Sequence, residues 1–185
     1  HRDLHSFPTR RSSDLARLTS AVEKLRALNP RLDIVTVLEN ASTENAEPLA
    51  READVIVDCA PLFQERFALN HAAVVLRKPM IECAVYDLEL HLTTLIPGRT
   101  PCLRCLYPES NPHWTRRFPV LGAVSATAGS LAAVEVVKVL AGLGEPLAGR
   151  MLIGDLRSMT FRQVRIQRLA DCAECGRLCP ESKAK

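Results

Sequence analysis

The order of apolar and polar positions along the chain predicts helices alternating with strands. Apolar residues recur at helical spacing in residues 18–28 and 63–76, and a stretch rich in small residues, 122–140, predicts a long core helix. A short helix ending at Arg51 is expected after Ser42-Thr43-Glu44, which can cap it. Alternating or Val/Ile-rich runs predict strands at 32–38, 55–57, 80–85, 88–96, 151–153 and 160–166. This alternation indicates an α/β fold with a mostly parallel sheet and flanking helices.

The first fifteen residues do not share this pattern. His1–Leu15 is basic, has no hydrophobic period, and matches the translation of a common sequencing-adapter oligonucleotide. We expect it to be foreign to the native protein, with a disordered basic tail as the alternative. Residues 16–179 would then form one partial domain and 180–185 a tail. On the adapter interpretation the native protein begins upstream of Ala16, and the chain is a C-terminal fragment.

Composition and charge argue against nucleic-acid and membrane binding. The net charge is only +3 and aromatic residues make up 4 %, which disfavours a platform for stacking bases. The longest uncharged stretch, 118–134, is too short to span a bilayer, so we expect a buried core helix there. The 185 residues suffice for one domain with a core. Seven cysteines, four of them in paired motifs, suit a reducing compartment, and we expect a cytoplasmic protein.

Two Cys-x-x-Cys motifs carry the clearest chemistry. Cys102 and Cys105 form the first and Cys172 and Cys175 the second, with 66 residues between them. Two such pairs complete the four-sulfur shell of a structural zinc ion, which here would staple two distant segments of the C-terminal part. A redox or disulfide role is the weaker alternative. Cys179 is a spare thiol or competing ligand, and we expect Cys59 and Cys83 to be buried core cysteines without chemistry.

An ordered set of motifs resembles the ThiF/MoeB/HesA family of ubiquitin-activating-enzyme-like adenylyltransferases. No single motif is specific, but their order spans nearly all of residues 16–176. The stretches that carry the resemblance are Leu25-x-x-Leu28-Asn29-Pro30, Asp54–Cys59, Arg66-x-x-x-Asn70, Pro101–Leu106, Gly129–Lys138 and Cys172-x-x-Cys175-Gly176.

The resemblance implies a Rossmann-like enzyme that uses ATP and Mg²⁺. Such an enzyme adenylates the C-terminal glycine of a ubiquitin-like sulfur-carrier protein, in thiamine- or molybdopterin-type biosynthesis, and works as a homodimer with structural zinc. The nucleotide-binding positions would be Asp58, Arg66 and Asn70, with Arg17 in place of the family's lysine.

The chain also departs from the family pattern. It contains no G-x-G-x-x-G phosphate loop, so we expect the fragment alone to be inactive. Pro61 stands where the family has its magnesium-binding aspartate, and proline cannot coordinate a cation. The loop 111–121 has no cysteine for a covalent intermediate, which suggests that sulfur transfer is left to a partner. The alternative is a non-catalytic, zinc-stapled relative that binds a ubiquitin-like protein or an active subunit.

Overall fold

The computed structural model describes residues 14–109, 113–115 and 117–178, without the side chains of 14–17 and 177. The chain divides into two compact units, residues 1–40 and 41–185. In the first unit, α1 (Asp14–Leu28) contains the predicted helix 18–28. The strand predicted at 32–38 is wrong, because these residues are irregular and Val35 is 85 % exposed. An alternating pattern becomes a strand only where a second strand takes its backbone hydrogen bonds.

The second unit is built on a five-stranded sheet in the order β1-β2-β3-β4-β5. The first two strands, β1 (Ile56–Asp58) and β2 (Met80–Tyr86), run parallel and are joined through α3 (Phe63–Leu76). The other three strands are each antiparallel to the strand before: β3 (Glu89–Leu95), β4 (Arg150–Asp155) and β5 (Thr160–Arg165). The α/β class is therefore confirmed, but the sheet is mixed.

The prediction of a mostly parallel sheet is wrong, and for two of the three antiparallel pairs, β2–β3 and β4–β5, the reason is local. Only Asp87 and Leu88 lie between β2 and β3, and only residues 156–159 lie between β4 and β5. A parallel neighbour needs a crossover of about a dozen residues or more, whereas turns this short can only reverse the chain. Asp87 and Met159 adopt positive φ values of 52° and 56° at these turns.

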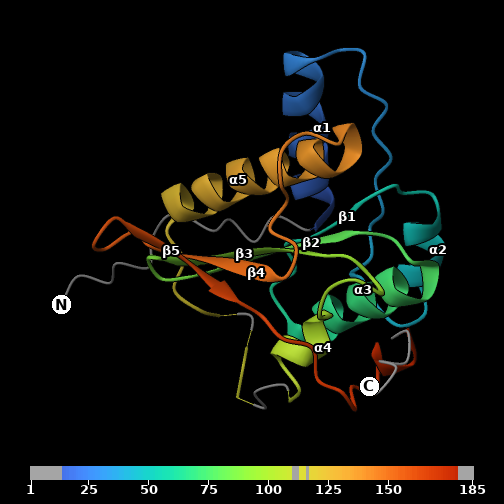
Figure 1. Ribbon diagram of the computed structural model, residues 1–185. Coiled ribbons are helices and arrows are strands. Elements are labelled where there is room, and N and C mark those ends of the chain that lie inside the picture. The colour runs from blue at the N-terminus through green and yellow to red at the C-terminus, as the bar shows by residue number, and fades with distance from the viewer. Residues whose placement is uncertain (1–13, 110–112, 116, 179–185) are drawn as a thin grey trace. The chain divides into compact units, whose positions relative to one another are not determined.

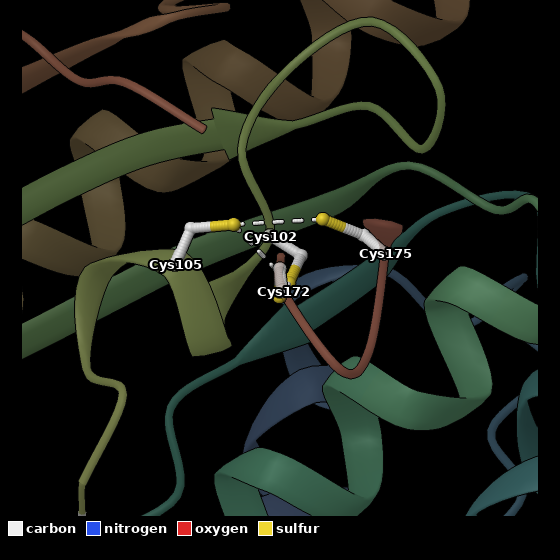
Figure 2. Close-up of side chains that lie close together, drawn as sticks. All are labelled: Cys102, Cys105, Cys172 and Cys175. Atoms are coloured by element: carbon white, nitrogen blue, oxygen red, sulfur yellow. Dashed lines mark hydrogen bonds between the residues drawn. The ribbon is translucent and has the colours of Figure 1, made fainter. Parts of the chain in front are cut away.

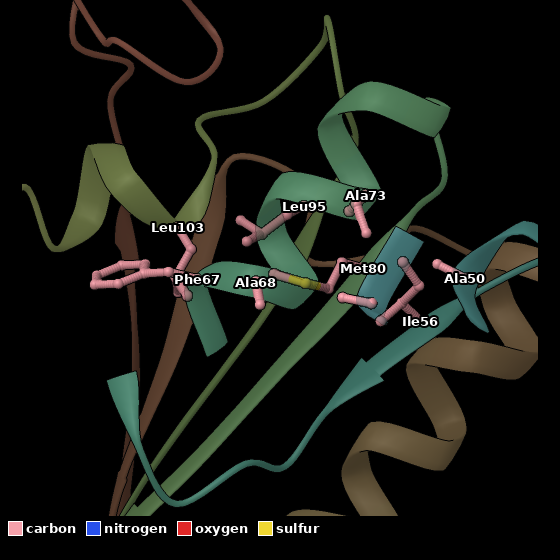
Figure 3. Close-up of a cluster of buried hydrophobic side chains, with 10 residues drawn as sticks. Ala50, Ile56, Phe67, Ala68, Ala73, Met80, Leu95 and Leu103 are labelled. Atoms are coloured by element: carbon pink, nitrogen blue, oxygen red, sulfur yellow. The ribbon is translucent and has the colours of Figure 1, made fainter. Parts of the chain in front are cut away.

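Helices cover both faces of the sheet in the second unit (Figure 1). On one face, α2 (Ala46–Arg51) and α3 bury a core that includes Ile56, Met80 and Leu95 (Figure 3). On the other face, α5 (Gly122–Ala141) packs on side chains of β2 and β3. Two short elements, α4 (Leu103–Leu106) and the 3₁₀ turn Gly176–Leu178, lie beside α3. Successive residues of each strand point to opposite faces, so the sequence position decides which core a side chain joins.

The expected core helix, α5, packs against the sheet along one of its faces. Val124, Ala128, Ala132 and Glu135 face the sheet, whereas residues of the opposite face such as Val137 are exposed. By length and composition alone, α5 is long and apolar enough to cross a membrane. No other helix among the described residues meets both conditions. The sheet-facing side of α5 carries a buried carboxylate, Glu135, which accepts a hydrogen bond from the Thr94 hydroxyl of β3.

Candidate functional site

The four cysteines of the two motifs converge on one point, although the motifs lie far apart in the chain. Figure 2 shows their sulfur atoms turned toward a common centre. All four Sγ atoms lie within 4.8 Å of one another. Closest approaches are 3.9 Å for Cys102–Cys105, 3.7 Å for Cys102–Cys172 and 3.5 Å for Cys105–Cys175. A disulfide would require about 2.05 Å, so these are four separate thiols.

Helix α3 positions both cysteine motifs. The Asn70 side-chain oxygen accepts a hydrogen bond of 2.8 Å from the backbone N–H of Leu103, which lies inside the first motif. His71 Nδ1 lies 2.7 Å from a carboxylate oxygen of Glu174, which lies inside the second motif. Val74 of the same helix packs against the four cysteines. One helix therefore anchors two segments that the sequence separates by 66 residues.

The geometry of the cysteine cluster suits a tetrahedral metal ion. Four sulfurs about 2.3 Å from a central Zn²⁺ lie about 3.8 Å apart, close to the separations found here. All four cysteines are buried. Burial raises the pKa of the Cys102 thiol to about 11, so a cation would be needed to hold this sulfur as a thiolate near neutral pH. These four residues could therefore hold a metal ion.

A second group of ionisable residues lies at the carboxyl end of the parallel strand pair. Asp58 ends β1, and Glu82 is its register partner in β2. Arg66 of α3 reaches both of them: its Nε donates to Asp58 Oδ2 at 3.0 Å, and its Nη2 donates to Glu82 Oε1. Both carboxylates are fully buried. We call these three residues the Arg66 cluster.

Burial dominates the electrostatics of the two carboxylates in the Arg66 cluster. It raises the pKa of Glu82 from about 4.5 to about 7, although the nearby guanidinium opposes the shift. Burial also raises the pKa of Asp58, against the same opposition from Arg66. For Arg66, burial acts to lower the pKa, but the two carboxylates outweigh it and the pKa is raised. Arg66 therefore stays cationic, while Glu82 can take up a proton near neutral pH.

Two cavities open beside Arg66. The α3-side cavity has a volume of about 260 Å³, and its lining includes four aromatic residues as well as Glu89 and His91. The α5-side cavity, about 220 Å³, lies against the second half of β2 and is lined by Cys59, Cys83 and Ser125, among others. Arg66, Pro61 and Trp114 line both cavities. The Trp114 ring N–H donates a hydrogen bond of 2.8 Å to the Pro61 carbonyl, which ties the loop after α4 to the end of β1.

The structure brings only some of the predicted nucleotide-site residues together. Asp58 and Arg66 form an ion pair, and Arg66 lines both cavities. Asn70 lies one turn further along α3 and faces the first cysteine motif through its bond to Leu103. The side chain of Arg17 lies outside the described residues, as do Cys179 and residues 1–13 and 180–185.

Sequence reasoning missed one residue and misjudged another. Glu82 was not singled out, although a charged residue inside the apolar run 80–85 is a signal for a buried ion pair. Cys59 was expected to be a buried core cysteine, but it follows the last residue of β1 and is exposed. Cys83 is buried, as expected.

Comparison with known proteins yields one family. A model of the ThiF family matches residues 6–176. The HesA protein of Nostoc sp. (strain PCC 7120 / SAG 25.82 / UTEX 2576) is 45 % identical over 165 residues, covering 89 % of this chain and 65 % of HesA. The sulfur carrier protein adenylyltransferase of Thermus thermophilus is 36 % identical over 165 residues, covering 84 % of this chain and 61 % of that protein. The chain thus spans less than two thirds of the length of these relatives.

Solved structures share the fold at low sequence identity. The crystal structure of E. coli MccB with ATP superposes with a TM-score of 0.71 at 19 % identity, covering 85 % of this chain and 51 % of MccB. A crystal structure of PaaA superposes with a TM-score of 0.62 at 19 % identity, covering 80 % of this chain and 54 % of that chain. Both likenesses concern the arrangement of helices and strands.

Proposed function

Because the chain belongs to the ThiF family, we propose that it is part of an ATP-dependent adenylyltransferase. The reaction would transfer AMP from ATP to a carboxylate and release pyrophosphate. We propose the C-terminal glycine of a ubiquitin-like sulfur-carrier protein as the substrate, because a named sulfur carrier protein adenylyltransferase is 36 % identical over most of the chain. The absence of cysteine from residues 111–121 supports a reaction that ends at the adenylate. A cytoplasmic location and a homodimer are part of the same proposal.

The observation that carries the proposal is the position of Arg66. It lies at the carboxyl end of two parallel strands, where α/β proteins commonly bind ligands, and it lines both cavities. A guanidinium has five N–H donors, and the two described ion pairs use two of them. Arg66 could therefore contact a nucleotide phosphate while Asp58 and Glu82 hold it in place. Arg17 would add a second cation in the intact protein.

Asn70 has a different role in this proposal. It is buried, and its carboxamide oxygen already accepts a bond from Leu103. We therefore propose that Asn70 positions the first cysteine motif rather than contacting the nucleotide.

We further propose zinc as the ion of the cysteine cluster. Four buried thiols at these separations match the shell of a structural Zn²⁺, with no coordination position left for chemistry. The ion would stabilise the fold by joining the segment after β3 to the segment after β5, and it would take no part in adenylation.

A second candidate function is a binding module without ATP chemistry. Pro61 favours it, because the expected magnesium ligand is missing beside Arg66. Such a protein would keep the zinc-stapled fold and bind a ubiquitin-like protein or an active subunit. ATP and Mg²⁺ would then have no functional site.

ATP–pyrophosphate exchange by the full-length parent protein separates the two candidates. We expect exchange that depends on Mg²⁺ and on a carrier protein, and that falls at least tenfold in Arg66→Ala. Arg104→Ala is the matched control, because Arg104 stacks on Phe67 outside the Arg66 cluster. Zinc content and circular dichroism establish that each variant is folded. Mg²⁺-dependent exchange would exclude the binding module, whereas a folded, zinc-loaded parent that binds its carrier without exchange would exclude the adenylyltransferase.

A further inference from the structure

Cys59 and Cys83 are neighbours across the parallel strand pair. The register of β1 and β2 ends with Asp58 paired to Glu82, and Cys59 and Cys83 are the next residues along each chain. Adjacent strands lie about 4.8 Å apart, which is within the Cα separation that a disulfide tolerates. The two cysteines each follow a paired residue and line one cavity, which makes them candidates for a disulfide.

The side chains of the two cysteines also share a face of the sheet. Asp58 and Glu82 both turn toward α3, where they meet Arg66. Because successive residues alternate, the cysteines that follow turn toward α5, and both line the α5-side cavity. Cys59 is exposed to solvent there, whereas Cys83 is buried behind it.

We propose that Cys59 and Cys83 form a peroxide-reactive thiol pair. In the first step the Cys59 thiolate attacks one oxygen of hydrogen peroxide. The O–O bond breaks, hydroxide leaves, and Cys59 becomes a sulfenic acid. In the second step the Cys83 sulfur attacks the Cys59 sulfur and displaces its oxygen as water. Two thiols and one peroxide yield one disulfide and two waters, with sulfur oxidised and peroxide reduced.

The environments of the two thiols fit these roles, in which Cys59 attacks peroxide and Cys83 then forms the disulfide. The pKa of Cys59 lies below its usual range, first because of its interaction with the neighbouring Cys83 thiol, and burial only partly opposes this. The pKa of Cys83 is raised, first by the same interaction with Cys59 and then by burial. Cys59 is the exposed thiol, so peroxide reaches it first, and the buried Cys83 is the partner for the second step. The four thiols of the cysteine cluster are buried and are shielded further when they hold a metal ion.

The test is peroxide titration of the full chain loaded with zinc. Trypsin cleavage without reduction yields peptides 52–66 and 78–99, each with one of the two cysteines. We expect the earliest product to be these two peptides joined by a disulfide, before zinc is released to a colorimetric chelator. In Cys83→Ser, dimedone should trap a sulfenic acid on Cys59. In Cys59→Ser, Cys83 should stay reduced over the same peroxide range.

Three results would overturn the proposal. One is oxidation of the cysteine cluster and release of zinc before any change at Cys59. Another is conversion of Cys59 to a sulfinic acid in the unmodified chain without a link to Cys83. The third is equal oxidation of Cys83 in Cys59→Ser. The peptide map of the unmodified chain shows which cysteines are oxidised first, so the test works even if a variant fails to fold. The proposal does not depend on the adenylyltransferase assignment.

Discussion

At the scale of single residues, Glu82 has the clearest consequence for pH dependence. Its pKa rises from about 4.5 to about 7 on folding, mainly through burial. Between these values the folded protein binds more protons than the unfolded chain, so the contribution of Glu82 to stability falls as pH rises. This contribution is fully present below about pH 4.5 and is lost by about pH 7, with a total of at most about 3 kcal/mol.

Glu82→Gln should remove this dependence while keeping the shape of the side chain and an acceptor for Arg66. We expect the free energy of unfolding of the parent, minus that of Glu82→Gln, to decrease between pH 4.5 and 7. Urea unfolding at several pH values, with zinc in excess, measures both proteins. Because Asp58 and the cysteine cluster are common to both, their own titration largely cancels. A difference that stays constant or rises with pH would show that Glu82 is ionised throughout.

The residues differ in how well the sequence predicted them. The four metal-ligand candidates were found because Cys-x-x-Cys spacing is set by the ion itself and not by the surrounding fold. Cys59 and Glu82 depend instead on where β1 ends and which face of β2 is covered. Those properties come from packing between strands and α3, which a local pattern does not contain.

At the scale of secondary structure, Glu135 joins α5 to the sheet. One of its carboxylate oxygens, Oε2, accepts from the Thr94 hydroxyl of β3 at 2.6 Å and from the Leu147 backbone N–H at 2.7 Å. The other oxygen accepts from Lys138 Nζ at 2.6 Å. Glu135→Ala should destabilise the protein by about 2 to 4 kcal/mol, because buried donors on β3 and on the segment before β4 lose their partner. Val137→Ala, at an exposed position of the same helix, should cost less than about 1 kcal/mol.

Chemical unfolding of Glu135→Ala and Val137→Ala by the same method measures the difference. Equal losses of stability would contradict the assigned role of Glu135.

The helices themselves were well predicted, since α3 begins and ends where its pattern does and α5 extends the prediction by one residue. Strand direction was not predicted, because it depends on turn length and on the partner chosen by each strand. The irregular segment 32–38 shows the same limit, since alternation describes one strand and pairing requires two.

At the scale of the whole chain, the cysteine cluster joins two segments of the second unit that lie 70 residues apart in sequence. Cys102 follows β3 and Cys172 follows β5, so the chain between them contains α4, α5, β4 and β5. A link of this kind stabilises mainly by restricting the unfolded chain, and a metal that binds only the folded state adds its binding free energy to folding. Metal loading and folding should therefore be coupled.

Removal of the metal should expose this coupling. We expect the purified chain to hold about one zinc ion per molecule, and a strong chelator to lower its unfolding midpoint by ten degrees or more. The double variant Cys102→Ser and Cys172→Ser should lose the ion and show the same low midpoint with or without chelator. Cys59→Ser, outside the cluster, should keep the ion and the midpoint of the parent. Elemental analysis and thermal unfolding by circular dichroism measure both quantities. If the double variant unfolds at the temperature of the zinc-loaded parent, α3 and the two helix-covered cores hold the segments together without the ion, and the cluster has no structural role.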